Sequence, residues 1–140
     1  MEELARRWFE IWSQRDFEAL GALYADDAEW IRADGVSVGP NEIVDYARAI
    51  ATAFPDEKAT IDAVLVSDGA VVVEWRESAT HTGPRETPVG TIPPTGRAFH
   101  DLRAVEVFRF RDGKIVSQHE YYDLYTVLRQ LGWLELLAQR

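Results

Sequence analysis

The spacing of apolar residues changes near the middle of the chain, and this change limits the folds that the chain can adopt. Up to about residue 54 the apolar side chains recur every three or four positions, as on one face of a helix. From residue 59 onward they alternate with polar side chains in runs that short turns separate, as in strands. Helices followed by paired strands predict an α+β fold, with the helices on one face of a curved antiparallel or mixed sheet.

Four helices are expected. The first spans three or four turns at the start of the chain, and its apolar face includes two tryptophans. The second covers residues 17–24, with Asp16 as its N-cap. The third begins near Pro40, and the fourth covers residues 125–131. Each has an apolar face that must pack against the rest of the molecule.

The strands are expected in the second half, apart from one short strand near the second helix. The pair Asp112 and Gly113 lies between two alternating runs and is a strong hairpin signal. Residues 83–96 contain four prolines and three glycines and are predicted to form a loop, either a plain exposed connector or a functional one. The predicted strands cover residues 28–32, 59–66, 70–82, 97–111 and 114–124.

The predicted hairpin also indicates which side chains face the core. A two-residue turn places Arg111 opposite Lys114, and the face that carries Phe108 and Phe110 is then the more apolar one. The other face carries three arginines and a lysine, which prefer water. With the preceding strand read in the same way, the polar residues predicted to face inward are Glu77, His81, Glu106, Ser117, His119, Tyr121 and Asp123.

Ionisable side chains on a core face need a partner or a function. Glu106 and His119 are predicted to lie opposite each other, which favours a satisfied structural pair over acid/base work. Asp123 has no obvious cationic partner, which favours a function, and its pKa is expected to be raised above that of a free aspartate. Glu77 is either a second pocket carboxylate or is displaced by a bulge.

Charge and composition exclude several classes of partner. The 140 residues carry 15 basic and 24 acidic side chains, a net charge of −9, and no cysteine. An acidic chain lacks the basic surface that nucleic acids and anionic membranes require. The three histidines have no metal-ligand spacing, so no metal site is expected. Without an apolar leader, a single cytoplasmic domain over residues 1–140 is expected.

Several short motifs, in order, resemble the SnoaL-like polyketide cyclases of the ketosteroid-isomerase and nuclear-transport-factor-like superfamily. The resemblance covers roughly residues 2–133, and each motif alone is weak. The motifs are the two tryptophans four residues apart, DFEAL at 16–20, LYADDA at 23–28, FPD at 54–56, PPTGR at 93–97, FRFRDGKI at 108–115, and YD at 122–123 with RQLG at 129–132.

The resemblance implies a cone-shaped α+β barrel around an apolar cavity, often dimeric through the outer sheet face, and chemistry without metal or cofactor. Outward Val105, Val107, Val116 and Tyr122 would suit that interface. Asp123 matches the proton-transfer aspartate and His81 a second polar pocket residue, with His119 and Tyr121 as secondary donors. The ligand would be a small hydrophobic, cyclic carbonyl compound. The apolar wall would comprise Trp8, Trp12, Trp30, Tyr46, Phe54, Trp75 and Phe108.

Two other functions remain open at this stage. The same cavity would serve a binding or accessory protein without turnover, since one fold hosts many functions. An epoxide-hydrolase-like activity would use Arg32 and Asp123. Steroid isomerisation by the ketosteroid-isomerase route is not expected, because Arg32 lies near the place of the base aspartate in that family.

Overall fold

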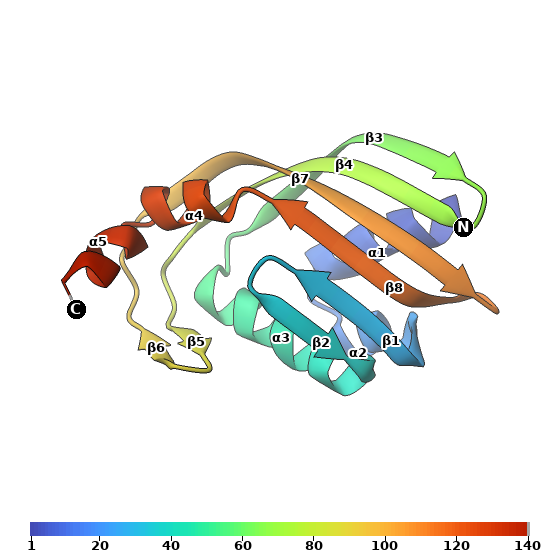
Figure 1. Ribbon diagram of the computed structural model, residues 1–140, viewed down its shortest axis with the longest axis horizontal. Coiled ribbons are helices and arrows are strands. Elements are labelled where there is room, and N and C mark those ends of the chain that lie inside the picture. Colours follow the sequence, from blue (N-terminus) through green and yellow to red (C-terminus); the bar gives the residue numbers. More distant parts are fainter. Residues whose placement is uncertain (140) are drawn as a thin grey trace.

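The computed structural model describes residues 1–139 and contains five helices and two sheets in that range (Figure 1). Two longer helices, α1 and α3, pack on one face of the larger sheet, and two short ones follow the last strand. The helices are α1 (Glu2–Gln14), α2 (Phe17–Ala22), α3 (Gly39–Ala53), α4 (Leu124–Gln130) and α5 (Trp133–Ala138).

The larger sheet has six strands in the order β2-β1-β8-β7-β4-β3, and only the β1–β8 pair is parallel. It is strongly curved and open, with β2 and β3 at its edges (Figure 1). These features confirm the predicted α+β class with helices on a mixed sheet. The strands are β1 (Tyr24–Arg32), β2 (Gly35–Val38), β3 (Lys58–Ser67), β4 (Ala70–Thr80), β7 (Ala98–Arg111) and β8 (Lys114–Tyr122).

Several segments differ from the sequence-based expectation, among them the strand β2, which the sequence analysis did not predict. The proline-rich segment is not only a loop, because β5 (Arg85–Thr87) and β6 (Gly90–Ile92) form a small hairpin within it. Its four prolines lie outside these two strands, as the missing N–H of proline requires. Helix α2 ends earlier than predicted because Tyr24 pairs with Ile115 of β8. The apolar C-terminal tail contains α5.

The core lies between α1 and the inner face of the sheet. Trp8 and Trp12 stack with ring centroids 5.1 Å apart, and Trp30 meets both rings edge-on. Trp8, Trp30 and Phe108 are almost fully buried. No helix within residues 1–139 is long and apolar enough to cross a membrane. The helical periodicity of the first residues therefore buries an aromatic stripe against the strands.

One bulge in β8 changes the predicted register. Arg111 faces Lys114, as predicted, but Val116 is an extra residue in the β7–β8 ladder. Beyond it the pairing shifts by one position, so Glu106 lies opposite Glu120. The prediction that alternate residues from Ser117 onward face inward is therefore wrong. A slip of one residue exchanges the two faces of a strand, so Gln118, Glu120 and Tyr122 point inward.

The side chains of strand β4 point to the faces of the sheet that the sequence predicts. Val71, Val73 and Trp75 are buried against the helices, and Glu77 points into the interior. A register irregularity occurs between Glu77 and Ala79, after the glutamate rather than before it. Glu77 therefore keeps its inward position and is not displaced by a bulge.

Candidate active site

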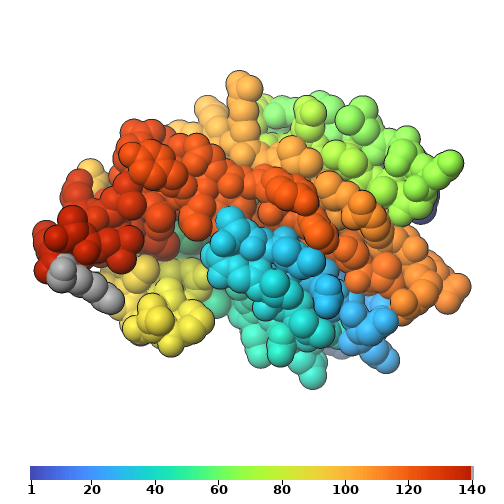
Figure 2. Space-filling model, viewed as in Figure 1, coloured from blue at the N-terminus to red at the C-terminus, as the bar shows by residue number. Residues whose placement is uncertain are grey.

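A cavity of about 220 Å³ lies between the helices, the inner sheet face and the β5–β6 hairpin. In the space-filling view the hairpin (yellow) lies between the C-terminal helices (red) and α3 (teal) (Figure 2). The side chains that line the cavity are mainly aromatic and aliphatic, with a few carboxylates. They are Trp8, Trp12, Trp30, Asp34, Tyr46, Ile50, Phe54, Glu57, Trp75, Glu77, Arg85, Thr87, Phe99, Glu120, Tyr122, Leu124, Val127, Leu128 and Trp133.

The predicted apolar wall lies around this cavity with one exception. Phe108 is completely buried in the core and does not line it. All five tryptophans of the chain line the cavity, including Trp133, which the sequence reading did not include. The indole N–H groups of Trp30 and Trp75 are buried and have no hydrogen-bond partner within residues 1–139.

Asp123 lies outside the cavity lining. It is exposed and is the N-cap of α4, where its carboxylate accepts hydrogen bonds from the Thr126 N–H at 3.1 Å and the Thr126 hydroxyl at 2.6 Å. These bonds lower the pKa of Asp123, so the expectation of a raised pKa is wrong. Capping an α-helix is a sufficient reason for an aspartate at this place.

The bulge also turns two predicted donors away from the cavity. His119 and Tyr121 contact each other on the outer side, with His119 Nδ1 and the Tyr121 hydroxyl 3.3 Å apart. Tyr121 is exposed, and neither side chain lines the cavity. Glu106 has no histidine opposite, so the predicted Glu106–His119 pair does not form.

His81 is fully buried just behind the cavity lining. Its Nδ1 accepts hydrogen bonds from the Thr95 N–H at 3.2 Å and the Trp133 indole N–H at 3.4 Å. Burial lowers the pKa of His81, which favours the neutral ring. An accepting Nδ1 places the ring proton on Nε2. His81 therefore holds Trp133 in the cavity wall.

A buried chain of hydrogen bonds leads to Glu106. The Trp8 indole N–H donates to the Tyr24 hydroxyl at 2.7 Å, and that hydroxyl donates to Gln118 Oε1. The Gln118 amide then donates to Glu106 Oε2 at 3.0 Å. An indole can only donate, so each bond fixes the direction of the next one. The chain therefore leaves Glu106 Oε1 as the atom that can carry a proton.

Glu106 and Glu120 are opposite each other on the inner face, and Glu120 alone of the two lines the cavity. Burial, and then the Glu120 carboxylate, raise the pKa of Glu106 well above its ordinary value. Burial also raises the pKa of Glu120 to about 7, although its hydrogen bond with Glu106 opposes this shift. The two carboxyl groups titrate as a pair, and because their hydrogen bond lowers the pKa of Glu120 and raises that of Glu106, Glu106 is its donor.

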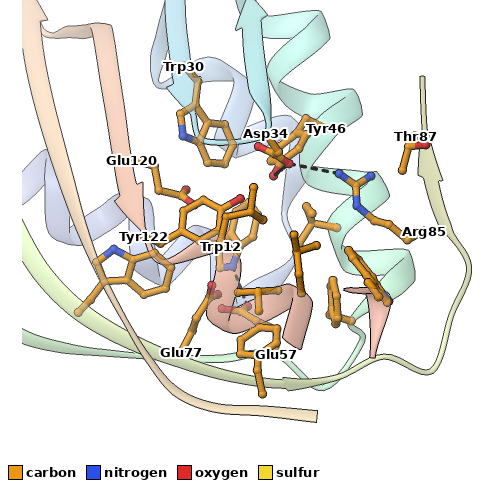
Figure 3. Close-up of a pocket in the computed structure, with 18 of the residues that line it drawn as sticks. Trp12, Trp30, Asp34, Tyr46, Glu57, Glu77, Arg85, Thr87, Glu120 and Tyr122 are labelled. Carbon is orange, nitrogen blue, oxygen red and sulfur yellow. Dashed lines mark hydrogen bonds and ion pairs between the residues drawn. The ribbon is translucent and has the colours of Figure 1, made fainter. Parts of the chain in front are cut away.

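A second pair of carboxyl groups lies elsewhere in the cavity, where Glu57 and Glu77 lie close together (Figure 3). The Trp12 indole N–H donates to Glu57 Oε2 at 2.7 Å. Burial, and then the charge of Glu57, raise the pKa of Glu77 well above its ordinary value. Asp34 lies at the opposite rim and pairs with Arg85 at 3.4 Å (Figure 3).

Arg32 and Asp123 do not form a common site. The Arg32 side chain is buried, pairs with Asp34 at 3.1 Å and packs 3.5 Å from the Tyr46 ring centroid. Asp123 is exposed at the start of α4. The arrangement that would have supported an epoxide-hydrolase-like mechanism is therefore absent at these two residues.

Sequence reasoning missed Glu57 and Glu120 as cavity residues. Glu57 follows the helix-breaking Pro55 and belongs to no periodic run, so no pattern indicated its direction. Glu120 was placed on the outer face by the unbroken alternation from Asp112 and Gly113. The available signal was that Gln118, Glu120 and Tyr122 lie at alternate positions of the strand. This alternation indicates a polar inner face only if the position of the bulge is known.

A curved mixed sheet with helices packed over an aromatic cavity defines the class of NTF2-like and ketosteroid-isomerase-like proteins. The chain is 22% identical, with a TM-score of 0.77, to an NTF2-like protein of unknown function from Burkholderia pseudomallei, covering 93% of this chain and 95% of that one. It matches TsrD from Streptomyces laurentii at 22% identity with a TM-score of 0.78, covering 94% of this chain and 93% of that one.

The chain belongs to the SnoaL-like polyketide cyclase family, whose family model matches residues 2–131. It is also 26% identical to IdmH, a putative polyketide cyclase from Streptomyces antibioticus, with a TM-score of 0.75 and coverage of 94% of this chain and 97% of that one. No curated protein matches the chain. Family and fold thus agree over nearly the whole sequence.

Proposed function

We propose that the protein is a cofactor-independent enzyme of the cyclase or isomerase type, acting on a small hydrophobic, cyclic carbonyl compound. Glu120 is its general base. One observation carries this proposal: a carboxyl group with a pKa of about 7 lines a cavity walled by aromatic rings. A base with a pKa near the working pH is the most effective one for proton abstraction. Glu120 takes the place that the family resemblance assigned to Asp123.

The reaction begins with ionised Glu120 and a substrate carbonyl in the cavity. Glu120 removes a proton from the carbon next to the carbonyl, and the electron pair of the broken C–H bond forms the enolate. The proton on Glu120 then returns to another carbon, giving an isomer. In a cyclase, the enolate carbon attacks a second carbonyl and the resulting alkoxide takes the proton.

Glu106 is a positioning residue in this mechanism. It holds its own proton and donates a hydrogen bond to Glu120, which keeps the pKa of Glu120 from rising further. The chain from Trp8 through Tyr24 and Gln118 orients that proton. Glu106 itself is buried and does not touch the cavity.

The test is deuterium exchange at the α-carbon of 2-tetralone in D₂O, followed by proton NMR. The wild-type protein should accelerate exchange over buffer, with a rate that rises through pH 7 as Glu120 ionises. Glu120→Gln should lose about 10²-fold or more of that acceleration. Asp123→Asn is the matched control, because asparagine also caps helices well, and it should exchange like wild type.

Two results would overturn the proposal. In one, Glu120→Gln exchanges as fast as wild type at every pH. In the other, the protein binds aromatic ketones, as seen by quenching of its tryptophan fluorescence, and never accelerates exchange. The second result would establish the non-catalytic binding protein instead.

We also propose that the protein forms a homodimer through the outer sheet face and that it is cytoplasmic. The outer face of the sheet carries half-buried Val105, Val107 and Val116 and exposed Tyr121. Tyr122 lines the cavity and does not lie on the outer face, so we propose Tyr121 as the tyrosine of the interface. Light scattering at micromolar concentration should give twice the monomer mass of 15.9 kDa, and the monomer mass would contradict this part.

A further inference from the structure

We infer that the Glu57–Glu77 end of the cavity binds a protonated amine carried by the substrate. This inference rests on the proposed function, because it describes a second contact of the same ligand in the same cavity. Glu120 would act on the carbonyl part of that ligand, while the two other carboxyl groups hold its cationic part (Figure 3). The substrate class is therefore an aminoketone or a related amine-bearing carbonyl compound.

The carboxyl group of Glu57 is held by the protein and lies beside that of Glu77. Its Oε2 accepts from the Trp12 indole at 2.7 Å and pairs with Arg15 Nη1 at 3.4 Å. Apart from the Glu77 carboxyl, its Oε1 has no hydrogen-bond partner among the residues that the structure describes, and the side chain is only 2% exposed. The two carboxyl groups therefore share a hydrogen bond for which Glu77 supplies the proton. An ammonium group bound between them would take the place of that proton.

Glu77 has no cationic partner in the described part of the chain. No ion pair forms on it, and burial, followed by the charges of Glu57 and Glu120, raises its pKa. These effects favour the neutral form of Glu77, and Arg85, which lines the cavity, is paired with Asp34 instead. The charged and titratable groups around this end are Arg15, Glu57, Glu106, Glu120 and Tyr122, whereas Asp34, Tyr46 and Arg85 lie at the opposite rim.

The arginines near the cavity do not provide an anion site. Arg15 pairs with Glu57, and both Arg32 and Arg85 pair with Asp34. A carboxylate or phosphate on the ligand would find carboxyl groups as its neighbours and would be repelled. The aromatic walls add to the preference for a cation, because the faces of indole rings attract ammonium groups. Five tryptophans line this one cavity.

Binding then exchanges one cation for another. The neutral Glu77 carboxyl releases its proton to solvent, and the ligand ammonium takes the place of that proton between Glu77 and Glu57. The O–H bond of Glu77 is the bond that breaks, its proton passes to the buffer, and the charge of the cavity is conserved. Binding of the amine near neutral pH is therefore coupled to proton release, which a neutral ligand would not cause.

The experiment compares three probes of similar size by quenching of tryptophan fluorescence at pH 7. They are protonated 2-phenylethylamine, neutral 2-phenylethanol and anionic 3-phenylpropanoate. The amine should bind at least about tenfold more tightly than the alcohol, and the anion should bind most weakly. Calorimetry in phosphate and in Tris buffer should show proton release for the amine only.

Glu77→Gln should lose the tenfold preference and the proton release, because glutamine has neither charge nor proton to exchange. Glu74→Gln is the control variant, since Glu74 precedes Trp75 on the same strand and is exposed on the outer face. It should behave like wild type. Equal binding of amine and alcohol by wild type, or an unchanged preference in Glu77→Gln, would overturn the inference.

Failure of this inference is distinguishable from failure of the proposed function. A protein that exchanges 2-tetralone protons through Glu120 but binds amine and alcohol equally would keep the function and lose the amine site. A protein that prefers the amine but never exchanges 2-tetralone protons would keep the amine site and lose the catalytic role of Glu120.

Discussion

The acids in and around the cavity fall into two groups that differ in their partners. Asp34 at the rim pairs with Arg32 and Arg85, and the buried side chain of Glu57 pairs with Arg15. On the strand wall, Glu77, Glu106 and Glu120 have no ion-pair partner within residues 1–139. The paired acids hold segments of the fold together. The unpaired acids have raised pKa values and are the groups that can exchange protons near neutral pH.

The alternation of the strands explains the difference. Arginines on β7 lie at the odd positions 103, 109 and 111, whereas the inward residues are at the even positions 102, 104, 106 and 108. A strand that places carboxylates on its inner face therefore places its arginines outside. The rim arginines come from other places: the end of α1, the end of β1 and the β5–β6 hairpin.

Removing a rim arginine should have the largest effect on stability. Arg32→Met removes one partner of Asp34, takes the guanidinium from the Tyr46 ring and breaks the buried hydrogen bonds of Arg32 to the Trp30 carbonyl and the Ser37 hydroxyl. We expect the free energy of unfolding to fall by about 3 kcal/mol, because each of these lost contacts costs about 1 kcal/mol. Urea denaturation monitored by circular dichroism measures this change. Arg6→Met is the control, and its exposed pair with Glu2 should contribute less than about 1 kcal/mol.

Removing an acid from the strand wall should raise the free energy of unfolding, whereas removing a rim arginine lowers it. The folded-state pKa of Glu120 is about 7 against an ordinary value of 4.5, so the folded state favours the protonated form. The stability associated with this group is complete below about pH 4.5 and is lost as the pH rises toward 7. Glu120→Gln should therefore be more stable than wild type at pH 8 by about 2 kcal/mol. The full difference between the two pKa values corresponds to about 3 kcal/mol, and solvent screening where Glu120 faces the cavity reduces it.

The same comparison at pH 4 should show almost no difference between Glu120→Gln and wild type, because Glu120 is then protonated in both states. Thermal unfolding at the two pH values measures it. A variant that is less stable than wild type at pH 8 would show that Glu120 is a compensated charge, like the acids of the rim.

The smallest expected effect concerns Glu106. Glu106→Gln keeps both an acceptor for Gln118 and a donor toward Glu120, so the pH midpoint of 2-tetralone exchange should stay near that of wild type. Glu106→Met removes the donor, and the midpoint should move to higher pH because the hydrogen bond no longer lowers the pKa of Glu120. Equal midpoints for the two variants would show that Glu106 has only a packing role.

Much of the fold could be predicted from local patterns. The turn at Asp112 and Gly113, the aromatic stripe of α1 and the inward direction of Glu77 and Glu106 all depend on short-range geometry. The cavity aromatics followed from the same alternation. These features need only the periods of helices and strands, which residue types report directly.

The candidate site could not be predicted in full, because it depends on contacts between distant parts of the chain. The bulge at Val116 has no residue signature and exchanges the two faces of the strand end. It occurs where β1 pairs with β8 in parallel, a contact between segments about ninety residues apart. Glu120 therefore replaces Asp123 inside the cavity, and Asp123 becomes a helix cap.

The most direct test of the account is a carbon NMR titration of the labelled side-chain carboxyl groups, assigned with Glu120→Gln and Asp123→Asn. Glu120 should titrate near pH 7, and Asp123 below its ordinary value of 3.8. A Glu120 carboxyl that titrates at or below its ordinary 4.5 would contradict the claim that this residue is the base.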